Sequence, residues 1–303
     1  VAALGVSQLP WLASLSLRQR CIFCLVAAYL PSYFNGSEKR PGSRSNSWLF
    51  SFLQNAGRRV LSQLFDIGFQ LEAPEALAAC DQCIVAVHPH GVLSMGHFLV
   101  FSGFDAAFDK AAPATCRCAL SAGILFRIPL LRELALAWGG VDAHRDIAKR
   151  CLSSGLSLSV VPGGEREQLM AQRGSTEHLV LKNRQGFVRL ALQHGVPLVP
   201  VYVFGEAQLF RQSQFLFGFR AWIQRNLGVA LVMPYGPGGV PCLPFGSTPV
   251  RVVVGSPLKV PRLPQPSPAE IEEHHSRYIR ELTDLFERNK VAAGYGDRTL
   301  KII

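Results

Sequence analysis

Short apolar runs alternate with longer ones along most of the chain. The short runs are rich in β-branched residues and bounded by Gly, Pro or Ser, as is typical of strands; they fall at Ile84–Val87, Arg117–Leu120, Leu156–Val161, Val196–Phe204 and Val250–Val254. The longer runs carry apolar residues at helical spacing; they fall at Leu93–Phe104, Ile128–Trp138, Ala143–Leu152 and Val180–His194. This alternation predicts an α/β domain with a mostly parallel central sheet flanked by helices.

The C-terminal helix has the clearest start. Ser267 and Glu270 have the spacing of a capping box, and Pro268 between them takes the first helical position, where its missing N–H is not needed. An apolar series at helical spacing follows, consisting of Ile271, Tyr278, Leu282, Leu285 and Phe286. Gly294 is placed to end this helix.

The N-terminal apolar segment is interrupted, and neither part is long enough to span a bilayer. Val1–Leu17 contains a proline and three serines, and Cys21–Leu30 provides ten apolar or small residues before Pro31, whereas a spanning helix needs ~20. The pattern predicts a hairpin entering one leaflet or an interfacial anchor, with the basic stretch Lys39–Arg44 on the cytoplasmic side. We therefore expect a membrane-associated segment with a basic linker at residues 1–47 and the main domain at residues 48–303. Because the chain begins with Val, the sequence leaves open whether residues precede it.

Composition and charge favour a lipid surface as a partner. Hydrophobic residues make up 49% of the chain and charged residues 17%, against the ~25% charged that is usual in soluble domains. The formal net charge of +10 favours anionic partners, which are nucleic acid, acidic lipid headgroups or a phosphorylated substrate. Because the basic clusters lie beside apolar segments, without a recognition module or interleaved aromatic residues, we expect no nucleic-acid partner.

Eight cysteines include the C-x-x-C pairs Cys21/Cys24 and Cys80/Cys83, a spacing that zinc sites also use. The first pair lies in an apolar run, where thiolate ligands would be costly, and Cys83 opens a predicted strand. Buried free thiols in a reducing compartment fit these surroundings better, so we expect no metal site.

The stretch CIVAVHPHG, Cys83–Gly91, joins a predicted strand to candidate catalytic residues. Pro89 keeps His88 out of the helical region, so the chain stays extended and the rings of His88 and His90 are expected on one face. Open α/β sheets bind ligands at the carboxyl ends of strands, and Gly91 lets the backbone approach a substrate. A histidine is a usable base near neutral pH, and free N–H groups of a following helix would stabilise an oxyanion. The alternative is that both rings are structural, cap the chain by hydrogen bonds, or form half of a metal site.

A second strand end, VVPGGERE at Val160–Glu167, also runs into glycines. Neither phosphate-loop pattern, G-x-x-x-x-G-K-[ST] or G-x-G-x-x-G, occurs in the chain. Glu165 or Glu167 is placed to orient a histidine or to hold a substrate hydroxyl, and a solvated acidic turn is the alternative.

Basic residues open an amphipathic helix at Lys182–Arg189. The planar guanidinium of arginine suits phosphate, although this spacing is equally typical of a solvated helix face. No G-x-S-x-G nucleophile elbow occurs in the chain, so a serine acyl-enzyme is poorly supported. A base that activates an acceptor hydroxyl directly is then the simpler chemistry.

Four blocks follow one another along the chain: HPHG at 88–91, VPGGEREQL at 161–169, LKNRQGFVRLALQHGVPLVPVYVFGE at 181–206 and VVVGSPLKVP at 252–261. Together they resemble the type-2 diacylglycerol acyltransferase family, which also includes monoacylglycerol and wax-alcohol acyltransferases. The likeness runs from Trp48 to the end of the chain. It implies a glycerolipid-acyltransferase-like fold in a membrane enzyme of the endoplasmic reticulum and lipid droplets, with its catalytic domain facing the cytosol. Such an enzyme moves a fatty acyl group from acyl-CoA, a co-substrate and not a cofactor, to a lipid hydroxyl.

The resemblance carries over to the histidine block first. His88 and His90 match the active-site histidines of the family, and Gly91 matches the glycine that follows them, where backbone N–H groups would stabilise the oxyanion. Related glycerolipid acyltransferases carry an aspartate five residues after the first histidine, but Leu93 stands there in this chain. The base must then be oriented from elsewhere, and Glu167 is our candidate.

The other blocks supply the remaining expected site residues. Glu167 matches the acidic residue that follows the P-G-G block, which consists of Pro162, Gly163 and Gly164. The R-x-G-F element of the family, which we assign to the phosphates of acyl-CoA, consists of Arg184, Gly186 and Phe187. No metal and no covalent intermediate is implied.

Two departures leave the acceptor open. The Tyr-Phe-Pro block usual before HPHG is not apparent, and His97 stands where the family commonly has a small residue. Diacylglycerol is the expected acceptor, with monoacylglycerol or a long-chain alcohol as the alternative. A lipid hydrolase or thioesterase and a non-catalytic lipid-binding protein are alternatives from other classes. The oligomeric state is left open, a homo-oligomer included.

Overall fold

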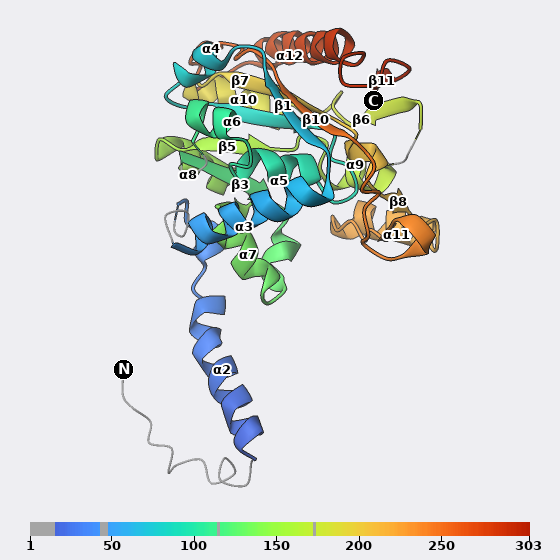
Figure 1. Ribbon diagram of the computed structural model, residues 1–303. Helices are drawn as coiled ribbons and strands as arrows, with labels where there is room; N and C mark the ends of the chain where they lie inside the picture. Colours follow the sequence, from blue (N-terminus) through green and yellow to red (C-terminus); the bar gives the residue numbers. More distant parts are fainter. Residues whose placement is uncertain (1–15, 43–47, 114–115, 172–173) are drawn as a thin grey trace. The chain divides into compact units, whose positions relative to one another are not determined.

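The structure, a computed structural model, describes residues 16–42, 48–113, 116–171 and 174–303. The chain forms two compact units, Val1–Ser37 and Glu38–Ile303. The second unit is the main domain and contains the central sheet and every candidate site residue (Figure 1). The residues around the expected boundary at 47 lie outside the described part of the chain.

The described part of the first unit contains one helix, α2 (Leu17–Tyr33). The hydroxyl of Ser16 accepts the N–H of Gln19, and the N–H of Ser16 donates to Oε1 of Gln19 at 2.8 Å, so a capping box begins the helix. The helix continues through Pro31 and does not end there. None of the described helices combines the length and the apolar character that crossing a membrane requires. Residues 1–15 are outside the described part, and the hairpin or interfacial anchor stays a prediction.

The central sheet of the main domain has seven strands in the spatial order β1-β10-β7-β2-β5-β3-β4. In chain order they are β1 (Ile67–Leu71), β2 (Ile84–His88), β3 (Arg117–Ser121), β4 (Gly140–Asp142), β5 (Ser157–Val160), β7 (Leu198–Phe204) and β10 (Val250–Val254). Neighbours are parallel except β10 and β7, which pair antiparallel. The predicted α/β fold with a mostly parallel sheet is confirmed. Two small sheets are formed by β6 (Thr176–Leu179) with β11 (Thr299–Ile302) and by β8 (Arg211–Gln212) with β9 (Pro234–Tyr235).

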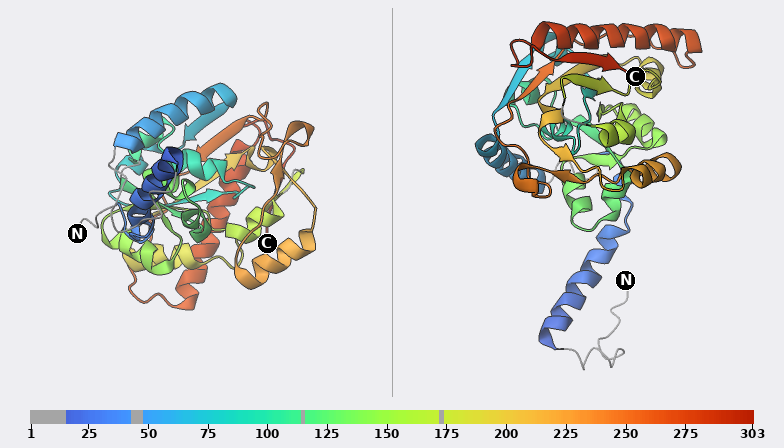
Figure 2. Two further views of the ribbon diagram at one scale, coloured as in Figure 1. Left: turned by 90° about the horizontal axis from the view of Figure 1, so that it is seen from below. Right: turned by 90° about the vertical axis from the view of Figure 1, so that its right-hand side faces the viewer.

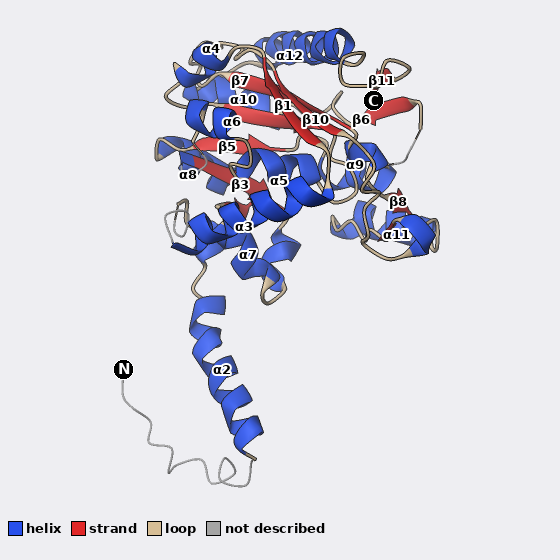
Figure 3. Cartoon of the chain, in the orientation of Figure 1, coloured by secondary structure: helices blue, strands red, loops and turns tan. Residues whose placement is uncertain are grey.

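Helices fill the connections between the strands (Figure 3). The α-helices of the main domain are α3 (Trp48–Leu64), α4 (Pro74–Ala78), α5 (Met95–Phe101), α6 (Ala106–Ala111), α7 (Leu131–Ala137), α8 (Arg145–Ser153), α9 (Gly164–Met170), α10 (Gly186–His194), α11 (Phe217–Leu227) and α12 (Pro268–Asn289). Short 3-10 helices are η2 (Ser37–Lys39), η4 (Gly123–Arg127), η5 (Glu206–Gln208) and η6 (Pro237–Gly239).

Side chains of β2 alternate between two hydrophobic cores, one on each face of the sheet. Ile84 and Ala86 pack with residues of α8, α10 and α12, whereas Val85 and Val87 pack with residues of α5 and α6. All four are fully buried, as expected for a parallel strand that is covered on both faces and therefore reads as a continuous apolar run. Figure 2 shows α12 lying along the outside of one face.

One predicted helix begins later than its apolar pattern indicates. The pattern covers Val180–His194, but the helix starts at Gly186. The backbone N–H groups of Leu181 and Lys182 donate to the carbonyl O of Ile303, at the end of the chain, so they are not available to a helix. Pairing with a distant segment thus overrides the local pattern.

The adjacent parallel strands β7, β2 and β5 bring three distant segments to one edge of the sheet. β2 ends at His88, β5 ends at Val160 just before the P-G-G block, and β7 ends at Phe204 just before Glu206. Because carboxyl ends of parallel strands meet at the same edge, the loops that follow them form one site.

Candidate active site

His88, the last residue of β2, is fully buried in the core beside α12. Its Nε2 lies 3.0 Å from the hydroxyl of Tyr278, and the ring of Tyr278 packs edge-on to Phe187 with centroids 4.9 Å apart. Burial lowers the pKa of His88 to about 3, so the ring is neutral at physiological pH. The ring of His88 is therefore enclosed by protein in this structure.

His90 is only partly buried and lies in the loop between β2 and α5. Its Nδ1 lies 3.0 Å from the carbonyl O of Gly91 and 2.9 Å from Oγ of Ser94. A carbonyl only accepts, so we assign the proton to Nδ1, which leaves a lone pair on Nε2. Oγ of Ser94 also lies 3.3 Å from Nε2, but its hydroxyl donates to the carbonyl O of His90 at 2.9 Å, so it does not use this lone pair. Burial lowers the pKa of His90 to about 4, which keeps the imidazole neutral at pH 7. Nε2 of His90 is therefore able to take a proton.

The two histidine rings do not share a face, contrary to the expectation. The strand ends at His88, and residues 91–93 form a turn. The ring of His88 contacts Tyr278 of α12 on one side of the sheet, whereas the ring of His90 contacts Ser94 at the start of α5, which covers the other side. Side chains alternate regularly only while the backbone stays extended. Of the two histidines, His90 is the candidate base.

Glu167 bonds the backbone of the histidine loop, residues 89–94 between β2 and α5, and does not bond a histidine ring. Its Oε1 accepts the N–H of His90 at 2.5 Å, and its Oε2 accepts the N–H of Val180 at 2.7 Å. The carboxyl packs over Gly163, where any Cβ would collide with it. Burial raises the pKa of Glu167 to about 7. The expectation that Glu167 orients the base is corrected: Glu167 fixes the loop, and the hydroxyl of Ser94 is bonded to the ring.

The P-G-G block forms the junction between β5 and α9. Pro162 and Gly163 precede the helix, and Gly164 begins it with a φ of +58°, a value that favours glycine. From the next turn of α9, Nε2 of Gln168 donates to the carbonyl O of Val92 at 2.8 Å. The helix that begins at this block therefore carries Glu167 and Gln168, whose side chains bond the backbone of the histidine loop.

A second buried carboxyl, that of Glu206, occupies the start of α5. Its Oε1 accepts the N–H of Met95 at 3.0 Å and its Oε2 accepts the N–H of Gly96 at 2.6 Å. Burial raises the pKa of Glu206 to about 8. Gly91 admits this carboxyl, because a Cβ at Gly91 would collide with it. Glu206 therefore already accepts these two N–H groups. This corrects the expectation that free N–H groups at the start of the helix stabilise an oxyanion.

The R-x-G-F residues lie in three different surroundings. Arg184 is exposed. Burial raises the pKa of Glu167, and the charge of Arg184 lowers it by a smaller amount. Gly186 is the exposed first residue of α10. Phe187 is buried against Tyr278, so it supports the partner of His88 and does not face the phosphates of acyl-CoA as expected.

Sequence reasoning misses three residues of this site: Ser94, Glu206 and Tyr278. Glu206 follows a predicted strand and a glycine, as the glutamates after the P-G-G block do, so the same reasoning could have found it. Ser94 carries only the weak signal of a polar residue before an apolar helix. Tyr278 has the spacing of an ordinary core position of α12, and only the folded structure brings it to His88.

The cysteines differ from the expectation of buried thiols. Of the two C-x-x-C pairs, only Cys83 is buried, whereas Cys80 is half-buried and both Cys21 and Cys24 are exposed. Among the residues that the structure describes, no group of three or more His, Cys, Asp or Glu is arranged to hold a metal ion.

A neutral imidazole with a free lone pair, held at the edge of an α/β sheet, suits proton removal from a hydroxyl. The family description "Diacylglycerol acyltransferase" matches residues 15–302. Human acyl-CoA wax alcohol acyltransferase 2 is 36% identical over 233 residues, 73% of this chain and 69% of that protein. Human diacylglycerol O-acyltransferase 2 is 31% identical over an alignment of 314 positions, gaps included, which covers 95% of this chain and 79% of that protein.

Among solved structures, the 1-acyl-sn-glycerophosphate acyltransferase PlsC from Thermotoga maritima aligns over 79% of each chain, with a TM-score of 0.49 and 16% identity. The family match spans nearly the whole chain, and it includes the histidine loop, the P-G-G block and the R-x-G-F element. This chain therefore belongs to the diacylglycerol acyltransferase family.

Proposed function

We propose that this protein is a membrane-bound enzyme that transfers a fatty acyl group from acyl-CoA to the free hydroxyl of diacylglycerol, forming triacylglycerol. The family match and the likeness to human diacylglycerol O-acyltransferase 2 support this acceptor. The observation that carries the chemistry is the pair of contacts at Nδ1 of His90, from Gly91 and Ser94, which leave Nε2 with a lone pair.

In the proposed reaction, the acceptor hydroxyl gives its proton to Nε2 of His90 while its oxygen attacks the thioester carbon of acyl-CoA. A C–O bond forms, the C–S bond breaks, and the proton passes from His90 to the departing thiolate of CoA. Because the base acts on the acceptor itself, the reaction needs no acyl-enzyme and no cofactor. N–H groups of the turn at Gly91 are our candidates for stabilising the negative charge that develops on the carbonyl oxygen.

We assign the phosphates of acyl-CoA to Arg184 and its basic neighbours. Arg184 is exposed, so phosphate can reach it without burying an unpaired charge, and its planar fork of donors matches phosphate oxygens. Arg166 and Lys182 are exposed as well and add positive charge on neighbouring segments of the same domain. Gly186 leaves space beside the first turn of α10, since no atom lies within 4 Å of a Cβ built there.

We assign membrane contact in the main domain to the α11 hairpin, residues 211–235 between β8 and β9. Phe215, Phe219 and Trp222 are 64%, 56% and 51% exposed on it. Buried Arg220 donates to the carbonyl O atoms of Phe215 and Leu231 at 3.0 and 3.1 Å, which fixes the backbone that carries these rings. The exposed rings therefore belong to an ordered element.

The charge of this hairpin fits a lipid surface. Residues 211–254 contain no Asp or Glu, whereas Arg211 and Arg225 are exposed. Exposed aromatic rings with basic residues beside them are typical of elements that lie in the headgroup region of a bilayer. Together with the N-terminal segment, the hairpin would hold the enzyme on the cytosolic side of the endoplasmic reticulum or on a lipid droplet.

His90→Ala tests the proposed function. The purified full chain is assayed in mixed micelles with labelled acyl-CoA and diacylglycerol. We expect triacylglycerol formation to fall at least about 100-fold, as for the loss of a general base. His274→Ala, on the half-exposed side of α12, is the matched control and should retain wild-type activity. Full activity of H90A, or release of free fatty acid without any acceptor, would contradict the proposal.

A further inference from the structure

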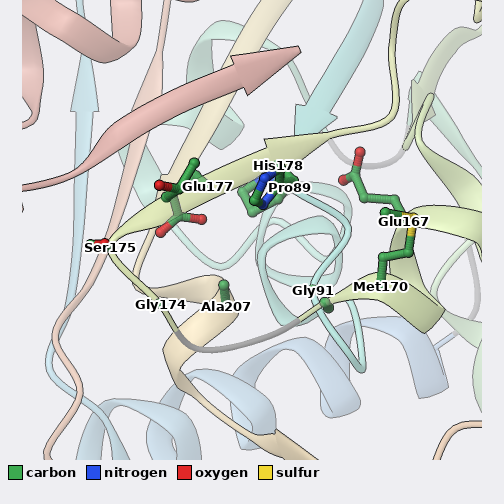
Figure 4. Close-up of a pocket in the computed structure, with 11 residues that line it drawn as sticks. Pro89, Gly91, Glu167, Met170, Gly174, Ser175, Glu177, His178 and Ala207 are labelled. Carbon is green, nitrogen blue, oxygen red and sulfur yellow. The ribbon is translucent and has the colours of Figure 1, made fainter. Parts of the chain in front are cut away.

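The residues that follow α12 return to the edge of the sheet where the candidate site lies. They form a segment, residues 290–303, that consists of a turn and strand β11, and we call this segment the C-terminal clamp. Figure 4 shows β11 (faint red) beside β6 (faint yellow-green), the strand that carries Glu177 and His178 at a cavity next to the histidine loop. The proposed reaction uses no residue of the clamp.

The clamp bonds the backbone on both sides of Val180. The N–H of Ile303 donates to the carbonyl O of Leu179 at 2.8 Å, and the carbonyl O of Ile303 accepts the N–H of Leu181 at 3.0 Å. Between these two bonds, the N–H of Val180 donates to Oε2 of Glu167 at 2.7 Å. The backbone of Ile303 therefore fixes the donor that Glu167 uses.

Glu167 carries this constraint to the candidate base. Its other oxygen, Oε1, accepts the N–H of His90 at 2.5 Å, and the residue is only 2% exposed. A carboxylate oxygen that loses its donor in such a buried place is costly, so the carboxyl must follow the N–H of Val180 if this group moves. A continuous series of hydrogen bonds thus runs from Ile303 through Val180 and Glu167 to the backbone of His90.

Tyr295 anchors the clamp to the main domain. Its residue is 6% exposed, its hydroxyl donates to the carbonyl O of Pro249 at 2.6 Å, and its ring stacks on Phe204 with centroids 5.9 Å apart. The carbonyl O of Tyr295 accepts the N–H of Arg298, the residue before β11, at 3.0 Å. Strand β11 therefore starts from a fixed point and pairs with β6 in one register.

We propose that the C-terminal clamp is a positioning element of the active site: it holds the backbone of His90 in place through Val180 and Glu167. The inference rests on the proposed acyl transfer and assigns a role in it to residues that the reaction itself does not use. A base must lie within hydrogen-bond reach of the acceptor hydroxyl, and a displacement of about 1 Å can lower the rate about 100-fold. Loosening the clamp should therefore lower kcat.

The first test removes one backbone N–H of the clamp. Ile303→Pro lacks the N–H that bonds Leu179, whereas Ile303→Ala keeps it, so the pair separates the hydrogen bond from the side chain. Both full-length variants are assayed in mixed micelles with labelled acyl-CoA and diacylglycerol. We expect kcat of I303P to be at least about tenfold below that of I303A, with KM values within about twofold of each other. Equal kcat values for the two variants would overturn the inference.

The second test measures the pH profile of the same two variants. The N–H of Val180 favours the charged form of Glu167, so weakening this contact raises the pKa of Glu167 above about 7. The rise of the acyl-transfer rate near pH 7 should therefore move about one pH unit higher in I303P than in I303A. Both variants retain the other titratable groups that act on this carboxyl or are influenced by it, which are Glu177 of β6, Arg184 before α10 and Tyr202 of β7.

The pH profile distinguishes positioning from a general loss of stability. Denaturant unfolding gives the folded fraction of each variant under the assay conditions. If kcat of I303P falls only in proportion to its folded fraction and the pH profile does not move, the clamp is merely structural and the inference is wrong. If I303P does not fold, Thr299→Pro and Thr299→Ala repeat the comparison at the other end of β11, where the N–H of Thr299 donates to the carbonyl O of Ser175 at 3.1 Å.

The outcomes separate this inference from the proposed function. If the wild-type protein acylates no acceptor, the proposed function fails. If the wild-type protein is active and the proline and alanine variants share one kcat and one pH profile, the proposed function stands and the clamp does not position the base.

Discussion

Two buried carboxyls hold the candidate base through the backbone. Glu167 accepts the N–H of His90, and Glu206 accepts the first N–H groups of α5, which follows the histidine loop. Burial raises their pKa values to about 7 and about 8. A protonated carboxyl has one oxygen that donates, so protonation weakens one of the two N–H contacts that each carboxyl makes. The position of His90 therefore depends on groups that titrate near neutral pH.

Glu167→Gln should change the pH profile of acyl transfer. Gln resembles a protonated Glu, because its amide accepts one N–H and presents a donor to the other. The Glu167 carboxylate forms as pH rises through about 7, so the wild-type rate should rise across this range, whereas the rate of E167Q should rise only through Glu206, near pH 8. We expect E167Q to be about tenfold slower than wild type at pH 8.5 and nearly equal at pH 6. Initial rates between pH 5.5 and 9 test this, and parallel profiles would contradict it.

Tyr278→Phe separates the roles of the two histidines. It removes the hydroxyl that lies 3.0 Å from Nε2 of His88 and leaves the ring of His88 buried without that partner. We expect the free energy of unfolding to fall by about 1–3 kcal/mol, the cost of an unpaired buried polar group, with kcat within about threefold of wild type. Denaturant unfolding and initial rates measure the two effects. A large loss of kcat in a protein of unchanged stability would instead place His88 in the reaction.

At the residue scale, sequence reasoning predicts which candidate residues lie close together but not the contacts that each of them makes. The rule that ligands lie at carboxyl ends of strands brings His88, His90 and Glu167 to one edge, as the structure has them. It cannot show which atoms meet, because the chain turns after the strand and alternation ends there. Ser94 reaches the ring of His90 through this turn, with a φ of +51°, which no local pattern predicts.

At the element scale, predictions succeed where one period dominates. The strand predicted at Val250–Val254 has the observed bounds, and the capping box at Ser267 forms with Glu270 as expected. They fail where an element depends on a distant partner. β6 pairs with β11, more than a hundred residues away, and its segment Thr176–Leu179 is not an apolar run. α9 begins directly at the P-G-G block, where glycines favour a loop in the sequence.

The contact between the histidine loop and η5 depends on a glycine. Gly91 has a φ of +61°, and a Cβ there would collide with the carboxyl of Glu206. Gly91→Ala should therefore lower the free energy of unfolding by about 2–3 kcal/mol and reduce kcat at least tenfold, because His90 must move. Gly57→Ala in α3 is the matched control: a Cβ there meets no atom within 4 Å, and alanine should add about 0.5–1 kcal/mol. Equal unfolding curves for both variants would contradict the packing argument.

At the scale of the whole molecule, the net charge and the exposed apolar surface both favour a lipid bilayer as the partner. The net charge is +10, and the exposed apolar residues of the main domain include those of α3 and α7 as well as the α11 hairpin. Figure 1 shows these three helices on the side of the main domain away from α12. A soluble protein rarely exposes so many large apolar side chains in neighbouring elements. We propose that this face lies against the bilayer and receives the lipid acceptors from it.

The double variant Phe219→Ser, Trp222→Ser tests this face. Burying a large side chain in lipid contributes about 1.5–3 kcal/mol, so losing both rings should weaken binding of the full chain to phosphatidylcholine vesicles at least tenfold in flotation assays. Val291→Ser, which removes a 72% exposed side chain beyond the end of α12, should leave binding unchanged. If the N-terminal segment alone binds vesicles, the double variant will bind like wild type. Vesicles of brominated lipid then test whether the hairpin enters the bilayer. We expect them to quench the tryptophan fluorescence of the wild-type protein more than that of the Trp222→Phe variant. Equal quenching of the two proteins would exclude the hairpin from the bilayer.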